Sequence, residues 1–235
     1  MVLEDEEFMH MIPIYAGAMI SNNHNHDNGI NNAKCYKAAN ESPFAEKWDM
    51  AMKEELDAIG QHQVCGNFVE LPEGRKALPT HRVYMIKHNG AANVQQFKAR
   101  LVCGGNHQIE GIDYQATYAP TARLGHVRLA LTIGAKYDLK IHQIDVCMAF
   151  FGVDLEEEIY MHSPQGYFRL LQHGGSSNDA RLTNTSRKMV LHLRHSLYDL
   201  KQSTHVWYYG TFKDFIISIG FVVLRVDGGL FVLHN

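Results

Sequence analysis

The chain has 235 residues, of which 46% are hydrophobic, and its formal net charge is −3. That is enough apolar material to bury a core. No run of 18 apolar residues occurs, which argues against a membrane span, and the acidic N-terminus does not resemble a secretory signal. The four cysteines are far apart and form no CxxC pair. This usage favours reduced thiols in a soluble intracellular protein of the cytoplasm or nucleus.

Charge is unevenly distributed along the chain. Residues 75–128 contain eight lysines and arginines but only two acids, Glu110 and Asp113, and the first 70 residues of the chain are strongly acidic. A negative net charge argues mildly against nucleic-acid binding. The basic middle is nevertheless compatible with a phosphate-facing surface, although a solvated charged face would give the same pattern.

The first 40 residues are predicted to be a poorly ordered leader, acidic at its start and rich in asparagine at 21–32. Ser42 and Pro43 then predict a helix start, as N-cap and first helical residue. The predicted helix ends at Gly60. Its apolar positions recur every three or four residues, at Phe44, Trp48, Met52, Leu56 and Ile59.

Extended segments follow the first helix. Strands are predicted at 83–88 and 97–102 with a turn at 88–93 between them, and in the second strand Lys98 and Arg100 share one face. Helices are predicted at 125–137 and 204–219, and a mobile loop at 174–186. The second of these helices is expected to present Tyr208, Phe212, Phe215 and Ile219 on one face. Further strands are predicted at 141–147, 158–161, 189–194 and 228–233. This irregular alternation of helices and strands predicts an α+β fold.

Asp145 lies near the end of a mostly apolar segment, IHQIDV. Burying a carboxylate there is unfavourable unless something pairs with it. Asp145 is therefore either a strand-end aspartate at a turn or a ligand for a hard metal ion such as Mg²⁺. Lys98 and Arg100 likewise allow two interpretations, a solvated strand edge or a phosphate contact, for which the planar guanidinium of arginine is suited.

Three blocks of sequence carry a family resemblance. They are FKARLVCGGNHQIEGIDYQATYAP at 97–120, QIDVCMAFFGVDLEEEIYM at 143–161 and SLYDLKQSTHVWY at 196–208. In this order and at this separation they resemble the reverse transcriptase of copia-type long-terminal-repeat retrotransposons. The resemblance extends over roughly residues 35–233. It implies the fingers and the first part of a ferredoxin-like palm of a right-hand polymerase, within a partial reverse transcriptase domain at 41–235.

The resemblance also implies an activity, RNA-directed DNA synthesis by two-metal nucleotidyl transfer. Mg²⁺ would be the cofactor, and an RNA or DNA template–primer and deoxynucleoside triphosphates the partners. Asp145 would be the catalytic metal ligand, Val146 a backbone ligand and Phe150 the steric gate against a 2′-hydroxyl. Substrate-binding roles carry over to Lys98 and Arg100 at the triphosphate, and to Tyr198, Lys201 and Gln202 near the template. Nothing in the pattern specifies an oligomeric state.

Departures from the family pattern leave a second interpretation open. Asp199 stands where the family has glycine, and His81-Arg82 where it has Lys-Trp. Gly152-Val153 replaces Asn-Gly, Thr204-His205 replaces Pro-Arg, and Gly104 and Asn106 replace a lysine and an aromatic residue. The family's Tyr-Val-Asp-Asp hairpin follows the segment matched by Asp227–Phe231, and these 235 residues do not contain it. We therefore expect a domain truncated before the Asp-Asp hairpin and inactive alone, or else a degenerate, non-catalytic remnant with weak nucleic-acid or protein binding.

The histidines offer no stronger alternative. Cys103 with His107, or His24 with His26, could begin a zinc site. No second pair at ligand spacing follows either of them, so the sequence does not favour structural zinc.

Overall fold

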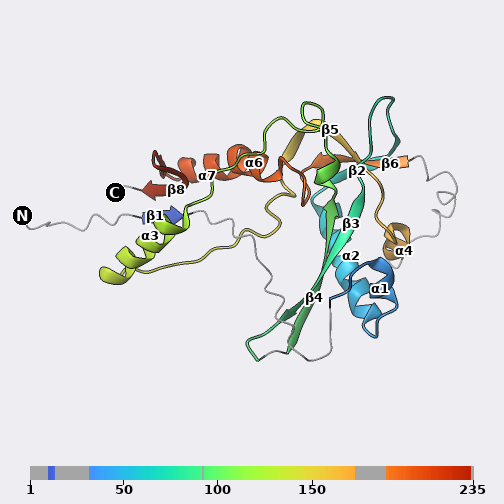
Figure 1. Ribbon diagram of the computed structural model, residues 1–235, viewed down its shortest axis with the longest axis horizontal. Helices are drawn as coiled ribbons and strands as arrows, with labels where there is room; N and C mark the ends of the chain where they lie inside the picture. The colour runs from blue at the N-terminus through green and yellow to red at the C-terminus, as the bar shows by residue number, and fades with distance from the viewer. Residues whose placement is uncertain (1–9, 14–31, 92, 173–188, 234–235) are drawn as a thin grey trace, which may run out of the picture. The chain divides into compact units, whose positions relative to one another are not determined.

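A computed structural model describes residues 10–13, 32–91, 93–172 and 189–233 (Figure 1). The chain divides into two compact units, which we describe separately. Unit 1 comprises Met1–Asn22, Tyr118–Cys147 and Thr204–Asn235, and unit 2 comprises Asn23–Thr117 and Met148–Ser203. Helices and strands are mixed in both units, in agreement with the α+β prediction. The loop predicted at 174–186 lies outside the described residues.

Unit 2 contains two antiparallel sheets and the helices packed on them. The long hairpin of β3 (Thr80–His88) and β4 (Val94–Cys103) forms one sheet. The other has the strand order β2 (Cys65–Glu70), β6 (Met189–His195) and β5 (Asp154–Met161). The helical segments are α1 (Tyr36–Asn40), α2 (Ala45–Gln61), η1 (Gly105–His107) and α4 (Tyr167–Gln172).

Helix α2 buries the apolar stripe predicted from its sequence. Trp48 lies edge-on to the ring of Tyr84, with centroids 5.2 Å apart, and to that of Phe97 at 4.6 Å. The helix begins at Ala45 with Phe44 as its N-cap, whereas the sequence predicts Ser42 as the N-cap and Pro43 as the first helical residue. The Ser42 hydroxyl instead bridges α1 and α2, because it donates to Ala39 O at 2.8 Å and accepts from Phe44 N at 3.2 Å.

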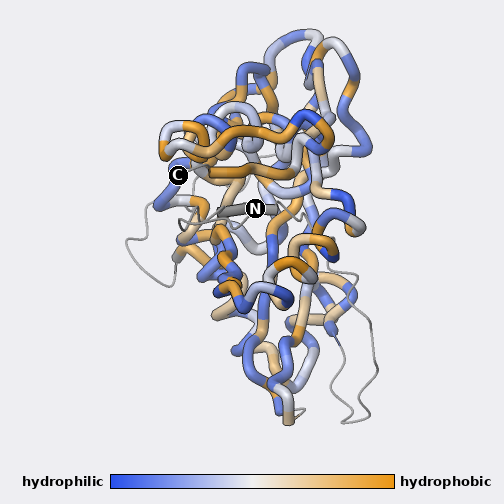
Figure 2. The backbone as a smooth tube through the Cα atoms, turned by 90° about the vertical axis from the view of Figure 1, so that its left-hand side faces the viewer, coloured by the Kyte–Doolittle hydropathy of each residue, from blue (hydrophilic) through white to orange (hydrophobic). Residues whose placement is uncertain are grey.

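The β3–β4 hairpin confirms the predicted alternation. Phe97, Ala99 and Leu101 are buried, whereas Lys98 and Arg100 point the other way and are opposite Met85 and Val83. Figure 2 colours the backbone by hydropathy and shows apolar and polar stretches mixed along the chain. Among the described residues, no helix is long and apolar enough to cross a membrane.

Unit 1 is built from helices and one antiparallel sheet. The sheet has the order β1 (His10–Pro13), β8 (Asp227–Leu233) and β7 (Val222–Leu224). A small core gathers Tyr208, Ile216, Phe221 and Phe231. The helical segments are α3 (Leu124–Lys136), α6 (Ser203–Trp207), the π-helical η3 (Tyr208–Phe212) and α7 (Lys213–Ser218).

Two predictions for unit 1 are wrong in detail. Residues 141–147 form no strand and are exposed, because a strand needs a hydrogen-bonding neighbour and none of the described residues pairs with them. In the predicted helix at 204–219 the inner face is formed by the buried Tyr208 and Ile216 and the partly buried Phe212, while Phe215 and Ile219 are exposed. The π-helical η3 explains this shift, since its wider turn moves the apolar stripe on by one residue.

The leader predicted to be poorly ordered includes two regular elements. Its residues 10–13 form β1, which pairs with β8, and its residues 36–40 form α1, which packs on α2. Residues 1–9 and 14–31 lie outside the described residues.

Candidate functional site

The turn at 196–203, within the third sequence block, is the best-anchored part of unit 2. Its backbone is held by Cys103 N, which donates to Tyr198 O at 3.1 Å, and by Ser196 N, which donates to Val153 O at 2.8 Å. Asp199 has a φ of +71°, in the left-handed region that glycine favours. The turn also touches Gly105 so closely that a Cβ there would lie 1.9 Å from Asp199 O.

Three predicted site residues that are far apart in sequence meet at this turn. The Arg100 guanidinium lies 5.7 Å from the centroid of the Tyr198 ring, within range of a cation–π interaction. Phe150 stands edge-on to the ring of Tyr198, and the two ring centroids are 6.0 Å apart. The Nε of Arg100 is buried and has no hydrogen-bond partner among the described residues. Arg100, Phe150 and Tyr198 together therefore place a guanidinium beside two aromatic rings.

Lys98 and Arg100 belong to an electrostatic group centred on Glu55 of α2. The Glu55 carboxylate accepts a hydrogen bond from Leu101 N at 3.1 Å, so the acid is fixed beside the strand that carries both cations. Burial raises the pKa of Glu55, and the same hydrogen bond, Lys98 and Arg100 act in the opposite direction. Glu55 therefore provides a local counter-charge for the cationic face of β4.

Lys201 and Gln202 have different environments although they are adjacent. The Lys201 ammonium donates to the Tyr114 hydroxyl at 3.1 Å and lies 4.8 Å from the centroid of that ring. Gln202 is only 1% exposed. Its amide nitrogen donates to Asp113 O at 2.8 Å and approaches Glu157 Oε2 at 3.3 Å. Gln202 therefore uses its side chain inside unit 2.

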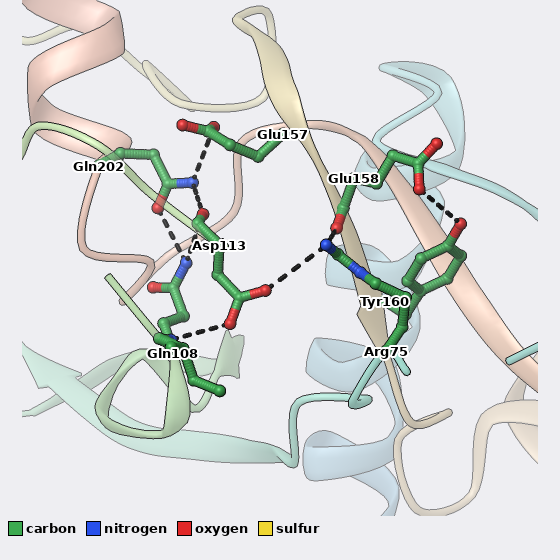
Figure 3. Close-up of polar contacts among 8 residues, drawn as sticks. Arg75, Gln108, Asp113, Glu157, Glu158, Tyr160 and Gln202 are labelled. Carbon is green, nitrogen blue, oxygen red and sulfur yellow. Dashed lines mark hydrogen bonds and ion pairs between the residues drawn. The ribbon is translucent and has the colours of Figure 1, made fainter. Parts of the chain in front are cut away.

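Figure 3 shows this buried amide as part of a larger polar network. Gln108 donates to Gln202 Oε1 at 3.0 Å and accepts from Lys201 N at 2.8 Å. Arg75 lies 3.5 Å from Asp113 Oδ1 and also donates to Glu158 O. Reasoning from sequence missed Gln108, because its partner is 94 residues away and no local pattern marks the pair.

The catalytic position predicted from sequence lies in unit 1. Asp145 and Val146 are on the exposed segment that follows α3, and neighbouring Ile144 is 86% exposed. Mg²⁺ in such sites takes oxygen ligands from one or two fixed carboxylates and from substrate phosphates. No group of three or more His, Cys, Asp or Glu side chains that could hold a metal occurs among the described residues. One exposed carboxylate on an unpaired segment does not by itself fit a two-ion site.

Comparison with known proteins identifies the family. Residues 64–235 match the family described as reverse transcriptase (RNA-dependent DNA polymerase). The chain belongs to the reverse transcriptase family. It is 36% identical, over 67% of its length, to a retrovirus-related Pol polyprotein from transposon TNT 1-94 of Nicotiana tabacum. It is 30% identical, over 81% of its length, to the Pol polyproteins from transposons RE1 and RE2 of Arabidopsis thaliana. These relatives confirm the predicted copia-type resemblance.

This reverse transcriptase segment spans 11% of the Nicotiana tabacum polyprotein and 12% of each Arabidopsis thaliana polyprotein. No solved structure matches it significantly.

Proposed function

We propose that this chain is the nucleotide-binding part of an RNA-directed DNA polymerase of a copia-type retrotransposon, with its fingers and the first part of its palm. In this proposal Arg100 and Lys98 bind the triphosphate of the incoming deoxynucleotide, and Phe150 and Tyr198 wall its sugar and base. Lys201 lies on the template side. Asp145 occupies the catalytic carboxylate position of the parent enzyme, and Val146 supplies the neighbouring carbonyl. Mg²⁺ is the cofactor of that parent reaction.

One observation carries this proposal, the convergence of Arg100, Phe150 and Tyr198. Each comes from a different one of the three sequence blocks that carry the family resemblance. In unit 2, Arg100 and Phe150 both contact the ring of Tyr198. A guanidinium beside aromatic rings suits a nucleotide, because its planar fork donates two hydrogen bonds to a phosphate while the rings offer apolar surface to the sugar and base. Glu55 maintains the position of the strand behind these cations.

The experiment is nucleotide binding by the 235-residue chain, measured as the fluorescence anisotropy of a labelled deoxyadenosine triphosphate. Arg100→Lys keeps the positive charge but loses the planar guanidinium that can donate two hydrogen bonds to one phosphate. We expect the affinity for the nucleotide to weaken about tenfold, equivalent to about 1.4 kcal/mol. Arg194→Lys is the matched control, since Arg194 is exposed on β6 of the same unit. Equal affinity of the Arg100 variant and the original chain would contradict the proposed triphosphate site.

The second candidate is a degenerate remnant that retains weak nucleic-acid binding without catalysis. It is favoured by the exposed, unpaired segment around Asp145 and by the buried Arg82 at a position where the family has tryptophan. Such binding would depend on the basic residues of 75–128. Counterion release would make its affinity fall steeply with salt, and contacts to phosphates alone would make it indifferent to sequence. Salt-sensitive binding of single-stranded DNA, with no measurable binding of the labelled nucleotide, would favour this candidate.

A further inference from the structure

The hydrogen bonds through Gln108 and Gln202 run in a direction that their neighbours fix. Asp113 O and the Glu157 carboxylate can only accept, so the nitrogen of the Gln202 amide must face them. Gln202 Oε1 must then accept, and it does so from Gln108 Nε2. Gln108 Oε1 in turn accepts from the Lys201 amide, which can only donate. The two glutamines therefore form one directional chain without a free polar end.

This chain joins two segments that carry different sequence blocks. One segment is the loop at 105–114, where Asp113 also accepts from Ile109 N at 2.8 Å. The other is the turn at 196–203, which holds Tyr198 against Arg100. On its remaining sides the turn is anchored to Val153 and to β4, and Ser203 Oγ closes it by donating to Leu197 O at 2.7 Å. Towards the 105–114 loop, the turn is held by the side chains of Gln108 and Gln202 and by the contact of Lys201 with Tyr114.

We infer that Gln202, through Gln108 and Asp113, is a positioning residue that sets where Tyr198 stands relative to Arg100. Gln202 thus acts on the nucleotide without touching it. The expected effect on nucleotide binding rests on the proposed function. The inference also replaces the direct substrate contact that the resemblance implied for Gln202 with an indirect, positioning role. A buried, fully satisfied amide pair suits this task, because loss of any member leaves its neighbours desolvated and unpaired.

The decisive variant is Gln202→Glu, which keeps the shape of the side chain and reverses its polarity. A carboxylate oxygen would then face Asp113 O and the Glu157 carboxylate, both of which repel it. Gln115→Glu is the matched control, since it adds the same charge to an exposed position next to Tyr114. Should Gln202→Glu fail to fold, Gln108→Glu makes the milder change, because one of its oxygens can still accept from Lys201 N.

Two measurements separate this inference from the proposed function. In chains labelled with 3-fluorotyrosine, the Tyr198 fluorine resonance, assigned with Tyr198→Phe, should shift in Gln202→Glu and stay in place in Gln115→Glu. Binding of the labelled deoxyadenosine triphosphate should weaken at least fivefold in Gln202→Glu only. Adding Glu157→Gln should recover part of both effects, because it removes one of the two repulsions.

An unshifted Tyr198 resonance in a folded Gln202→Glu chain overturns the inference, and so does a shifted resonance accompanied by unchanged nucleotide affinity. If the original chain binds no nucleotide, the proposed function fails. The fluorine resonance and its recovery by Glu157→Gln then still show whether the glutamine pair positions Tyr198.

Discussion

Asp199 carries backbone strain at the centre of the candidate site. Its φ of +71° lies where a side chain is disfavoured by about 1–2 kcal/mol and glycine is not. We expect Asp199→Gly to raise the free energy of unfolding by about 1 kcal/mol, measured by urea denaturation. Asp154→Gly is the control, since Asp154 is exposed in a strand and its replacement should destabilise. A loss of stability in Asp199→Gly would mean that the aspartate side chain contributes more than the strain removes.

Arg82 is the residue that stands where the resemblance to copia-type reverse transcriptases leads us to expect tryptophan. It is 9% exposed on β3 and donates to Gln165 O at 2.5 Å, but its Nε and Nη2 have no hydrogen-bond partner among the described residues. Burial lowers its pKa, and Tyr84 and Tyr36 offset part of that effect. A buried cation with two unpaired donors is unfavourable.

Replacing Arg82 by an apolar side chain should therefore stabilise the protein. Arg82→Met keeps a long unbranched shape, and Arg82→Trp introduces the residue that the resemblance leads us to expect there. We expect each to raise the free energy of unfolding by about 1–2 kcal/mol in urea. Arg194→Met, at an exposed position, should change it by less than about 0.5 kcal/mol. Destabilisation by both Arg82 variants would show that the guanidinium makes a net favourable contribution.

The cysteines should divide into two reactive and two unreactive thiols. Burial raises the pKa of Cys65 and of Cys103 to about 12, whereas Cys35 and Cys147 are exposed. Since the thiolate is the reactive form, the half-buried Cys65 and the buried Cys103 should remain protonated and inert at pH 8. Titration with a disulfide reagent should modify two thiols within minutes and all four only in denaturant. Rapid modification of all four in the folded chain would contradict the raised pKa of Cys65 and Cys103.

At the scale of elements, the first turn of α3 depends on an acid 104 residues away. Asp227 of β8 accepts from Arg123 N at 2.9 Å and from His126 Nδ1 at 2.6 Å, while its other oxygen accepts from Gly229 N. Burial raises the pKa of Asp227, but these three hydrogen bonds outweigh burial and hold the pKa below its usual range. The carboxylate thus caps the helix from outside it.

The depressed pKa makes this cap a source of pH dependence. Its contribution is present above the ordinary aspartate value near 3.8 and is lost as pH falls through the lower value in the folded chain. We expect Asp227→Ala to cost about 1–2 kcal/mol at pH 7 and to flatten the fall in stability below pH 4. Hydrogen exchange should show α3 losing protection first, and Asp214→Ala, at an exposed position, is the control. Unchanged protection of α3 would exclude the capping role.

Elements were predictable where the signal was local. The apolar stripe from Phe44 to Ile59 and the alternation from Phe97 to Leu101 both identify the buried face, because helix and strand periods follow from backbone geometry alone. The π-helical turn was not predictable, and so Ile216 replaced Phe215 on the buried face. Residues 141–147 show the same limit, since their apolar content does not specify a partner strand.

At the scale of the whole molecule, the candidate site was predictable only as a set of residue types. The sequence blocks identified Arg100, Phe150 and Tyr198, and unit 2 brings them together. The sequence could not indicate that Gln202 is buried against Gln108, because that contact depends on long-range folding. Motifs alone therefore do not distinguish residues that could face a ligand from buried residues that hold those residues in position.

We expect these 235 residues alone to provide no catalysis. A two-metal mechanism depends on ions held in fixed geometry by several anionic ligands, whereas Asp145 is on an exposed segment and the chain contains no Tyr-Val-Asp-Asp. We expect primer extension on an RNA template by the purified chain to be no greater than that of Asp145→Asn. Extension clearly above that control would contradict the argument from fixed coordination. A fusion that supplies a Tyr-Val-Asp-Asp hairpin, made with and without Asp199→Gly, would then measure how far the missing acids and the strained turn each limit the activity.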